Sequence, residues 1–340
     1  MRDDSDVQPI RIAMWSGPRN ISTALMRSWG SRSDCFVSDE PLYAHYLSEI
    51  DEGKRREHPA YHEVMRSQPT DWHEVAAYLT GPVPHGKPVW YQKHMAHHLT
   101  SKIEHEWIFK LTNAFLLRDP ARMVVSFNKV IPNPRPEDLG LPQQLELFER
   151  IFTTTGEIPA VIDSDAVLAN PEKMLNTLCE YLRVPFDRGM LSWPPGARDT
   201  DGVWAPHWYE RVNQSTGFGP LVSDPIDPPK HLHAVIHECT AIEAELLKYA
   251  LRPFTPGWVE RIREAQSFKH IRFQEGVVLE RVRYGSEQDD YGSNNKRCGD
   301  CGVAQSQFHV NGCDVDRCPR CKEQAISCDC ECELIESTNS

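Results

Sequence analysis

The residues with the clearest chemical potential lie in one short turn, where Arg19 precedes two hydroxyl side chains. A guanidinium group can bind a phosphate or sulfate through two parallel hydrogen bonds, and hydroxyl groups add neutral donors. An apolar run precedes the turn and apolar residues at helical spacing follow it, which predicts a strand, a turn and a helix. The first N–H groups of such a helix, together with its dipole, attract anions. We therefore predict an anion-binding cradle made of Gly17, Pro18, Arg19, Asn20, Ser22 and Thr23.

A second group of candidate residues has side chains that can accept or donate protons. Glu40 follows the predicted second strand, and the carboxyl end of a parallel strand borders the ligand crevice of an open α/β sheet. Lys93, His94 and His97 follow the predicted third strand, and histidine can act as a general base near neutral pH. We predict that Glu40, or else His94 or His97, is the base. The alternatives are a solvated loop carboxylate and histidines that only pack or cap.

Arg118 and Ser126 form a third candidate pair. Arg118 ends an apolar run at 113–117, and Ser126 lies two turns into the helix that follows. Asp119 suits the N-cap of that helix and Pro120 its first position, so the local structure is well specified. A charged guanidinium group, which can donate two parallel hydrogen bonds, and a neutral hydroxyl together suit a monoester phosphate. The alternative is a capped helix with an incidental arginine.

Cysteine is concentrated near the carboxyl end, where eight of the eleven cysteines lie between Cys298 and Cys332. Paired C-x-x-C motifs favour tetrahedral zinc over disulfides in a chain without a secretion signal, and a disulfide-rich tail is the alternative. We predict two closed, structural sites, with Cys332 as an alternative ligand in the second. Their ligands would be Cys298, Cys301, His309 and Cys313, and Cys318, Cys321, Cys328 and Cys330.

These residues need a parallel sheet with helices between its strands to bring them together. Apolar strand-like runs alternate with stretches of helical spacing, which predicts the α/β class. We divide the chain into an α/β domain at 8–255, a connecting segment with a polar linker at 256–297, and a small cysteine-rich module at 298–334. The net charge of −12 disfavours nucleic-acid binding. The sequence has no long apolar span and a polar N-terminus, which predicts a cytoplasmic protein without membrane contact.

The order of these motifs resembles that of the sulfotransferases, in which a Pro-Lys/Arg-Ser-Gly-Thr-Thr turn follows the first strand. Pro18, Arg19, Ser22 and Thr23 match that turn, while Asn20 and Ile21 stand where the family usually has Ser and Gly. The RDP sequence at 118–120 followed by Ser126 is similar to the family's 3′-phosphate site. The Lys-His pair at 93–94 is similar to its Lys-x-His run, and the cysteine-rich segment resembles a zinc ribbon.

This resemblance implies a P-loop NTPase-like parallel sheet flanked by helices. It also implies transfer of a sulfuryl group from 3′-phosphoadenylyl sulfate (PAPS) to a hydroxyl or amine of a small-molecule acceptor. The family's Arg-Lys-Gly closing loop is absent. Arg198 and Arg211 are candidate substitutes for it, and Trp204 or Trp208 is a candidate for stacking on adenine. A kinase that uses ATP, with Asp39 holding Mg²⁺, is one alternative, although the G-K-[ST] motif is missing. A non-catalytic scaffold whose zinc module binds a protein partner is another.

Overall fold

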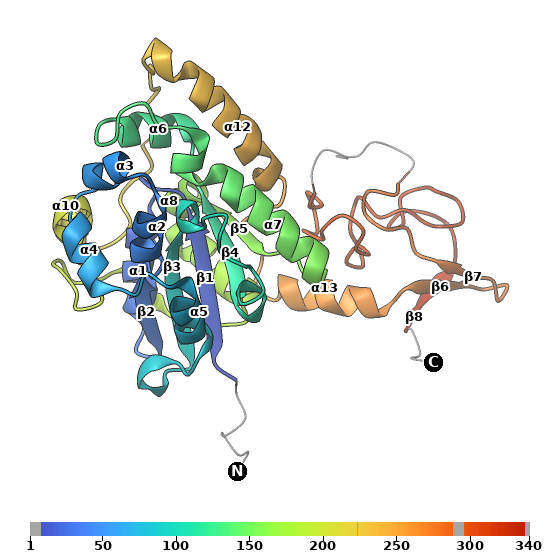
Figure 1. Ribbon diagram of the computed structural model, residues 1–340. Coiled ribbons are helices and arrows are strands. Elements are labelled where there is room, and N and C mark those ends of the chain that lie inside the picture. Colours follow the sequence, from blue (N-terminus) through green and yellow to red (C-terminus); the bar gives the residue numbers. More distant parts are fainter. Residues whose placement is uncertain (1–7, 223, 288–295, 337–340) are drawn as a thin grey trace.

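A five-stranded parallel sheet organises the computed structural model, which describes residues 8–222, 224–287 and 296–336. The strand order is β2-β3-β1-β4-β5. The predicted first strand and turn are observed. β1 is the central strand, and a short turn connects it to α1 (Figure 1). The strands are β1 (Ile10–Ser16), β2 (Cys35–Asp39), β3 (Val89–Met95), β4 (Thr112–Leu117) and β5 (Ala160–Asp163).

Helices cover both faces of this sheet, and β1 shows how the sequence divides between them. Ile12 and Met14 pack into one core with α1, α2, α9 and α13, whereas Ala13 and Trp15 pack into another with α5, α6, α7 and α12. Successive strand residues point to opposite faces, so a continuous apolar run is required when both faces are buried. The longer helices are α1 (Ser22–Gly30), α2 (Tyr43–Glu49), α5 (Trp72–Thr80), α6 (Pro120–Asn128), α7 (Leu141–Thr155), α9 (Pro171–Tyr181), α12 (His233–Leu247) and α13 (Trp258–Ser267).

Shorter helices complete the α/β region. They are α3 (Glu52–Glu57), α4 (Tyr61–Ser67), α8 (Ser164–Ala169), α10 (Ala205–Trp208) and α11 (Glu210–Gln214). A 3-10 turn at Ile108–Lys110 leads into β4. No helix in the described parts of the chain is both long enough and apolar enough to span a membrane.

The cysteine-rich region extends to one side of the α/β body, beyond α13 (Figure 1). It contains an antiparallel sheet in the order β7-β6-β8. Its strands are β6 (His270–Phe273), β7 (Val278–Glu280) and β8 (Cys332–Ile335). The stretch predicted as a connector therefore supplies α13 and two strands. Of the polar linker at 285–296, residues 288–295 lie outside the described residues.

Candidate functional site

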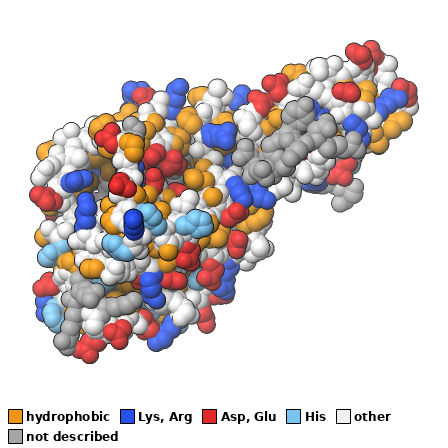
Figure 2. Space-filling model, turned by 90° about the horizontal axis from the view of Figure 1, so that it is seen from above, with side chains coloured by type: hydrophobic (Ala, Val, Ile, Leu, Met, Phe, Trp, Pro, Cys, Tyr) orange, Lys and Arg blue, Asp and Glu red, His pale blue; other side chains and the backbone are white. Residues whose placement is uncertain are grey.

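A cavity of about 600 Å³ lies at the carboxyl edge of the sheet and brings most of the candidate residues together. One wall carries the anion cradle with Arg118 and Ser126, and another carries Glu40, Lys93 and His97. Figure 2 views this edge from above and shows histidine and basic side chains close together. His94 and Gly17 do not line the cavity.

The cradle takes its shape from local hydrogen bonds rather than from a glycine-rich sequence. Arg19 has a φ of 57°, in the left-handed region, while Ile21 has an ordinary φ of −83°. Ile21 therefore fits the position where the related motif has glycine. The side chain of Asn20 spans the turn, since its Nδ2 donates to the carbonyl of Leu116 at 3.1 Å and its Oδ1 accepts from the N–H of Ile21 at 2.7 Å. Within the described parts of the chain no side chain caps the start of α1, which leaves its first N–H groups available to a ligand.

Arg19 and Arg118 supply the positive charge of this wall. Nε of Arg19 donates to Oγ of Ser126 at 2.9 Å, and Arg118 donates to the backbone carbonyl of Arg19. Burial lowers the pKa of both arginines, and nearby Arg211 lowers that of Arg19 further. Among the described residues, neither Arg19 nor Arg118 forms an ion pair with a carboxylate. An anion that carries more than one negative charge would offset the mutual repulsion of these guanidinium groups.

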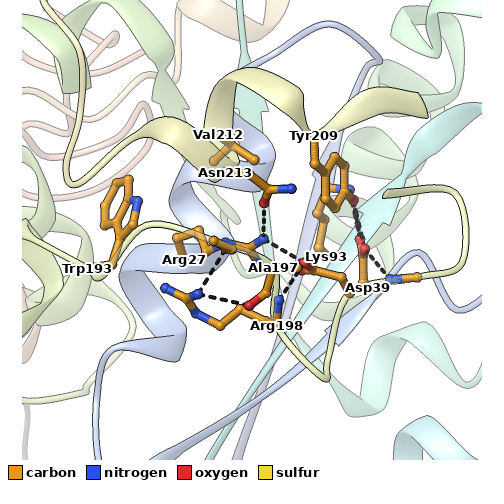
Figure 3. Close-up of polar contacts among 12 residues, drawn as sticks. Arg27, Asp39, Lys93, Trp193, Ala197, Arg198, Tyr209, Val212 and Asn213 are labelled. Carbon is orange, nitrogen blue, oxygen red and sulfur yellow. Dashed lines mark hydrogen bonds and ion pairs between the residues drawn. The ribbon is translucent and has the colours of Figure 1, made fainter. Parts of the chain in front are cut away.

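Lys93 lies in a buried polar network rather than free in the cavity (Figure 3). Its Nζ lies 2.8 Å from Oδ1 of Asp39, 2.5 Å from Oε1 of Glu40 and 2.8 Å from the hydroxyl of Tyr209. Burial favours the neutral amine, but Asp39 and Glu40 outweigh it and raise the pKa of Lys93. Burial also raises the pKa of Glu40, against the pull of Lys93. The sequence did not indicate Tyr209, which comes from a distant segment.

The predicted histidines occupy different environments. His94 lies on the opposite side of β3 from Lys93 and stacks on Trp15 with ring centroids 4.2 Å apart. His97 lines the cavity beside His98 and His58, and its Nδ1 has no hydrogen-bond partner among the residues that the structure describes. Burial lowers the pKa of His97 to about 3 and that of His58 to about 4, so both rings are neutral at physiological pH. His58 follows a polar helix at some distance along the chain, and no local pattern singled it out.

The segment at 193–218 places the two candidate arginines, and likewise the two candidate tryptophans, in different environments. Arg198 bonds to backbone carbonyls of its own segment, and Trp204 is buried against the hydroxyl of Tyr209. Trp208 and Arg211 instead line the cavity, with the guanidinium of Arg19 5.8 Å from the ring centre of Trp208. A buried ion pair between Arg27 of α1 and Asp201 fixes this segment to the α/β body.

The two predicted metal-binding quartets are assembled in the cysteine-rich region. The ligand atoms within each quartet all lie within 4.8 Å of one another, a separation that suits a single ion. The first quartet is largely buried, whereas the second contains the exposed Cys321. Cys332 is not part of either group and begins β8. Both quartets can hold a metal ion.

The solved structures that this chain resembles include two sulfotransferase domains, each at low sequence identity. The sulfotransferase domain from the curacin biosynthetic pathway is 15% identical, with a TM-score of 0.42 and coverage of 68% of this chain and 98% of that one. The sulfotransferase domain from the Synechococcus PCC 7002 olefin synthase is 13% identical, with a TM-score of 0.41 and coverage of 71% and 98%.

Curated relatives show closer similarity in sequence. The branched-chain-amino-acid aminotransferase-like protein 1 of Arabidopsis thaliana is 36% identical over 214 residues, which is 62% of this chain and 37% of that protein. The similarly named protein 2 is 34% identical over 230 residues, or 67% of this chain and 40% of that one. The chain thus spans about two fifths of the length of these relatives. The sulfotransferase domain family matches residues 10–240, and the chain belongs to that family.

Proposed function

We propose that this protein transfers a sulfuryl group from PAPS to a hydroxyl or amine of a small-molecule acceptor. The observation that supports it most is the convergence of Arg19, Arg118, Ser126 and the start of α1 on one cavity. Two arginines without carboxylate partners suit a donor that carries anionic groups at two positions. PAPS would supply the activated sulfuryl group.

The residues of the cradle have a defined task in this proposal. Arg19 and the first N–H groups of α1 would bind the 5′-phosphosulfate and stabilise the charge that develops on its leaving oxygen. Arg118 and Ser126 would bind the 3′-phosphate. Arg211 and Trp208 would close this end of the cavity, in place of the missing Arg-Lys-Gly loop.

Proton removal from the acceptor would fall to Glu40 or His97, both of which line the cavity. The raised pKa of Glu40 makes it a better proton acceptor than an ordinary carboxylate. His97 also lines the cavity and is the alternative base, but burial lowers its pKa to about 3 and so makes it the weaker proton acceptor of the two. Lys93 would hold Glu40 in place through the 2.5 Å contact.

Tyr43 and His98 give the end of the cavity near Glu40 an aromatic wall that suits an apolar acceptor.

The contacts of Asp39 disfavour the kinase alternative. Its carboxylate accepts hydrogen bonds from Lys93, from the hydroxyl of Tyr209 and from the N–H of Gly202. A magnesium ion would have to displace these partners.

We propose separately that the two cysteine quartets bind structural zinc ions, since four protein ligands leave no open position for catalysis. The module that they form would be available to a protein partner.

Calorimetric titration with adenosine 3′,5′-bisphosphate, and with ATP plus Mg²⁺, tests the proposal. We expect the bisphosphate to bind and ATP to bind weakly or not at all. Transfer of radiolabelled sulfate from PAPS to a panel of phenols, alcohols and amines would then identify the acceptor. Binding of ATP alone would contradict the proposal, and binding of neither nucleotide would favour a non-catalytic scaffold.

A further inference from the structure

His309 joins the first cysteine quartet to a carboxylate outside it. Its Nδ1 lies 3.3 Å from Sγ of Cys301 and 3.2 Å from Sγ of Cys313. Its Nε2 lies 2.8 Å from Oε1 of Glu287, and both side chains are nearly fully buried. The other carboxylate oxygen of Glu287 accepts from the N–H of Gly285 at 2.6 Å. The carboxylate is therefore held in place while one ring nitrogen faces the thiols.

This arrangement matches the way in which proteins orient metal-bound histidines, whose second N–H commonly donates to a carboxylate. We propose that Glu287 orients His309 toward a zinc ion in the first quartet, and that this ion is held more tightly than one in the second. The inference rests on the proposal that both quartets bind zinc.

The first quartet is continuous with the α/β body. Cys298 and Cys313 belong to the same apolar core as α1 and α9. Arg297, which precedes the quartet, donates from Nε to the carbonyl of Tyr249 at 2.9 Å and from Nη2 to the hydroxyl of Tyr181 at 3.1 Å. Release of a metal from this quartet requires movement of groups that are packed on both sides.

Helix α13 adds a second anchor for the first quartet. The side-chain amide of Gln266 forms two hydrogen bonds of 2.9 Å with the backbone of Phe308, next to His309. Arg281 donates to the carbonyl of His309 at 2.6 Å and to Asp316 at 3.0 Å. The histidine is therefore fixed through its ring and through its backbone.

The second quartet lacks such support. It adjoins a small apolar cluster formed by Ile271, Phe273 and Cys318, with partly buried neighbours. Cys321 is exposed, and no ligand in this quartet is a histidine with a carboxylate partner. A chelator can reach these thiolates without unfolding the α/β body, so we expect the second quartet to release zinc faster than the first.

The experiment uses the full chain, expressed with zinc and freed of excess metal. Mass spectrometry of the metal content should give about two zinc ions per chain, as the two quartets require. The chromogenic chelator 4-(2-pyridylazo)resorcinol should then remove them in two phases of about equal amplitude. Substitution Cys321→Ser should abolish the fast phase and leave the slow one.

Substitution Glu287→Gln tests the orienting carboxylate. We expect the slow phase to accelerate by about 10- to 100-fold, the usual effect on metal affinity of removing such a partner, with the fast phase unchanged. The matched control is Glu280→Gln, because Glu280 pairs with exposed Arg283 and contacts no ligand. This control should leave both phases unchanged.

The outcomes separate the two proposals. A parent protein without zinc would overturn the zinc proposal itself. Two zinc ions released in one phase would overturn the difference between the quartets. Two phases that Glu287→Gln leaves unchanged would overturn the role of Glu287 alone. Cobalt-loaded protein provides a second readout, since Glu287→Gln should shift the absorption bands of the site with one histidine ligand and not those of the four-cysteine site.

Discussion

Nζ of Lys93 lies 2.8 Å from Oδ1 of Asp39, and each of these side chains is only about 1% exposed. The two residues are register partners on the neighbouring strands β2 and β3. Their contact joins the sheet to the segment at 193–218, because Asp39 also accepts from Tyr209 and from the N–H of Gly202. The pair therefore organises the end of the cavity that carries Glu40 and Tyr209.

Replacement of Lys93 by methionine should destabilise the fold by about 3–5 kcal/mol, because it leaves buried carboxylates without their cation. Urea unfolding followed by tryptophan fluorescence measures this free energy. The matched control is Lys102→Met, since Lys102 pairs with Glu49 at the surface and should contribute less than about 1 kcal/mol. Equal effects from the two substitutions would show that the Lys93 network is not a structural centre.

Arg118→Lys should weaken binding of adenosine 3′,5′-bisphosphate by about ten- to a hundredfold, the loss expected for a charged hydrogen bond. Binding of adenosine 5′-monophosphate, which lacks the 3′-phosphate, should change much less. Calorimetry on both ligands gives the two affinities. Arg122→Lys is the control, because Arg122 lies nearby in the first turn of α6, does not line the cavity and donates to the carbonyl of Asp224. A parallel loss for both nucleotides would contradict a 3′-phosphate site at Arg118.

Local spacing was enough to predict the parts of the site that come from one short segment. The strand-turn-helix around Arg19, the capped helix after Arg118 and the grouping of the residues in each candidate quartet depend on neighbours along the chain. In each case the backbone has few alternatives, because a proline, a cap or a C-x-x-C pair fixes the local path. These parts of the sequence therefore predicted which residues would lie together.

The partners of Lys93 were not predictable in the same way. Its contact with Asp39 depends on β2 lying next to β3 in the sheet. Its contact with Tyr209 depends on how the segment at 193–218 packs against the sheet, which local sequence does not determine. The direction of the His94 side chain was predictable, because consecutive residues of a strand point to opposite faces of the sheet. If Lys93 faces the cavity, His94 faces the other core, and the structure has this arrangement.

Stability should fall as the pH drops below about 6.5, because His97 and His58 are buried as neutral rings. Their folded pKa values are lowered to about 3 and about 4, against 6.5 for an ordinary histidine. Between these values the unfolded chain binds protons that the folded chain does not. Each histidine therefore contributes stability above pH 6.5 that is lost at about 1.4 kcal/mol per pH unit as the pH falls toward its folded pKa.

Urea unfolding of the parent and of His97→Asn at several pH values measures this effect. The slope of the unfolding free energy against pH should be smaller in the variant by about one proton. Acid also protonates cysteine thiolates, but this affects both proteins, so the difference between them isolates the histidine. Identical slopes would show that His97 has similar pKa values in the folded and unfolded states.

Gly17→Ala should disturb the cradle although Gly17 does not line the cavity. A Cβ at this position would lie 2.4 Å from the carbonyl oxygen of Leu139 and 2.7 Å from Cε of Met123, closer than nonbonded atoms approach. Overpacking of this kind costs about 1–3 kcal/mol, and displacement of the turn should also weaken binding of adenosine 3′,5′-bisphosphate. Gly219→Ala is the control for stability, since a Cβ there meets nothing within 4 Å. If Gly17→Ala binds the bisphosphate as tightly as the parent, the backbone of this turn does not form the anion site.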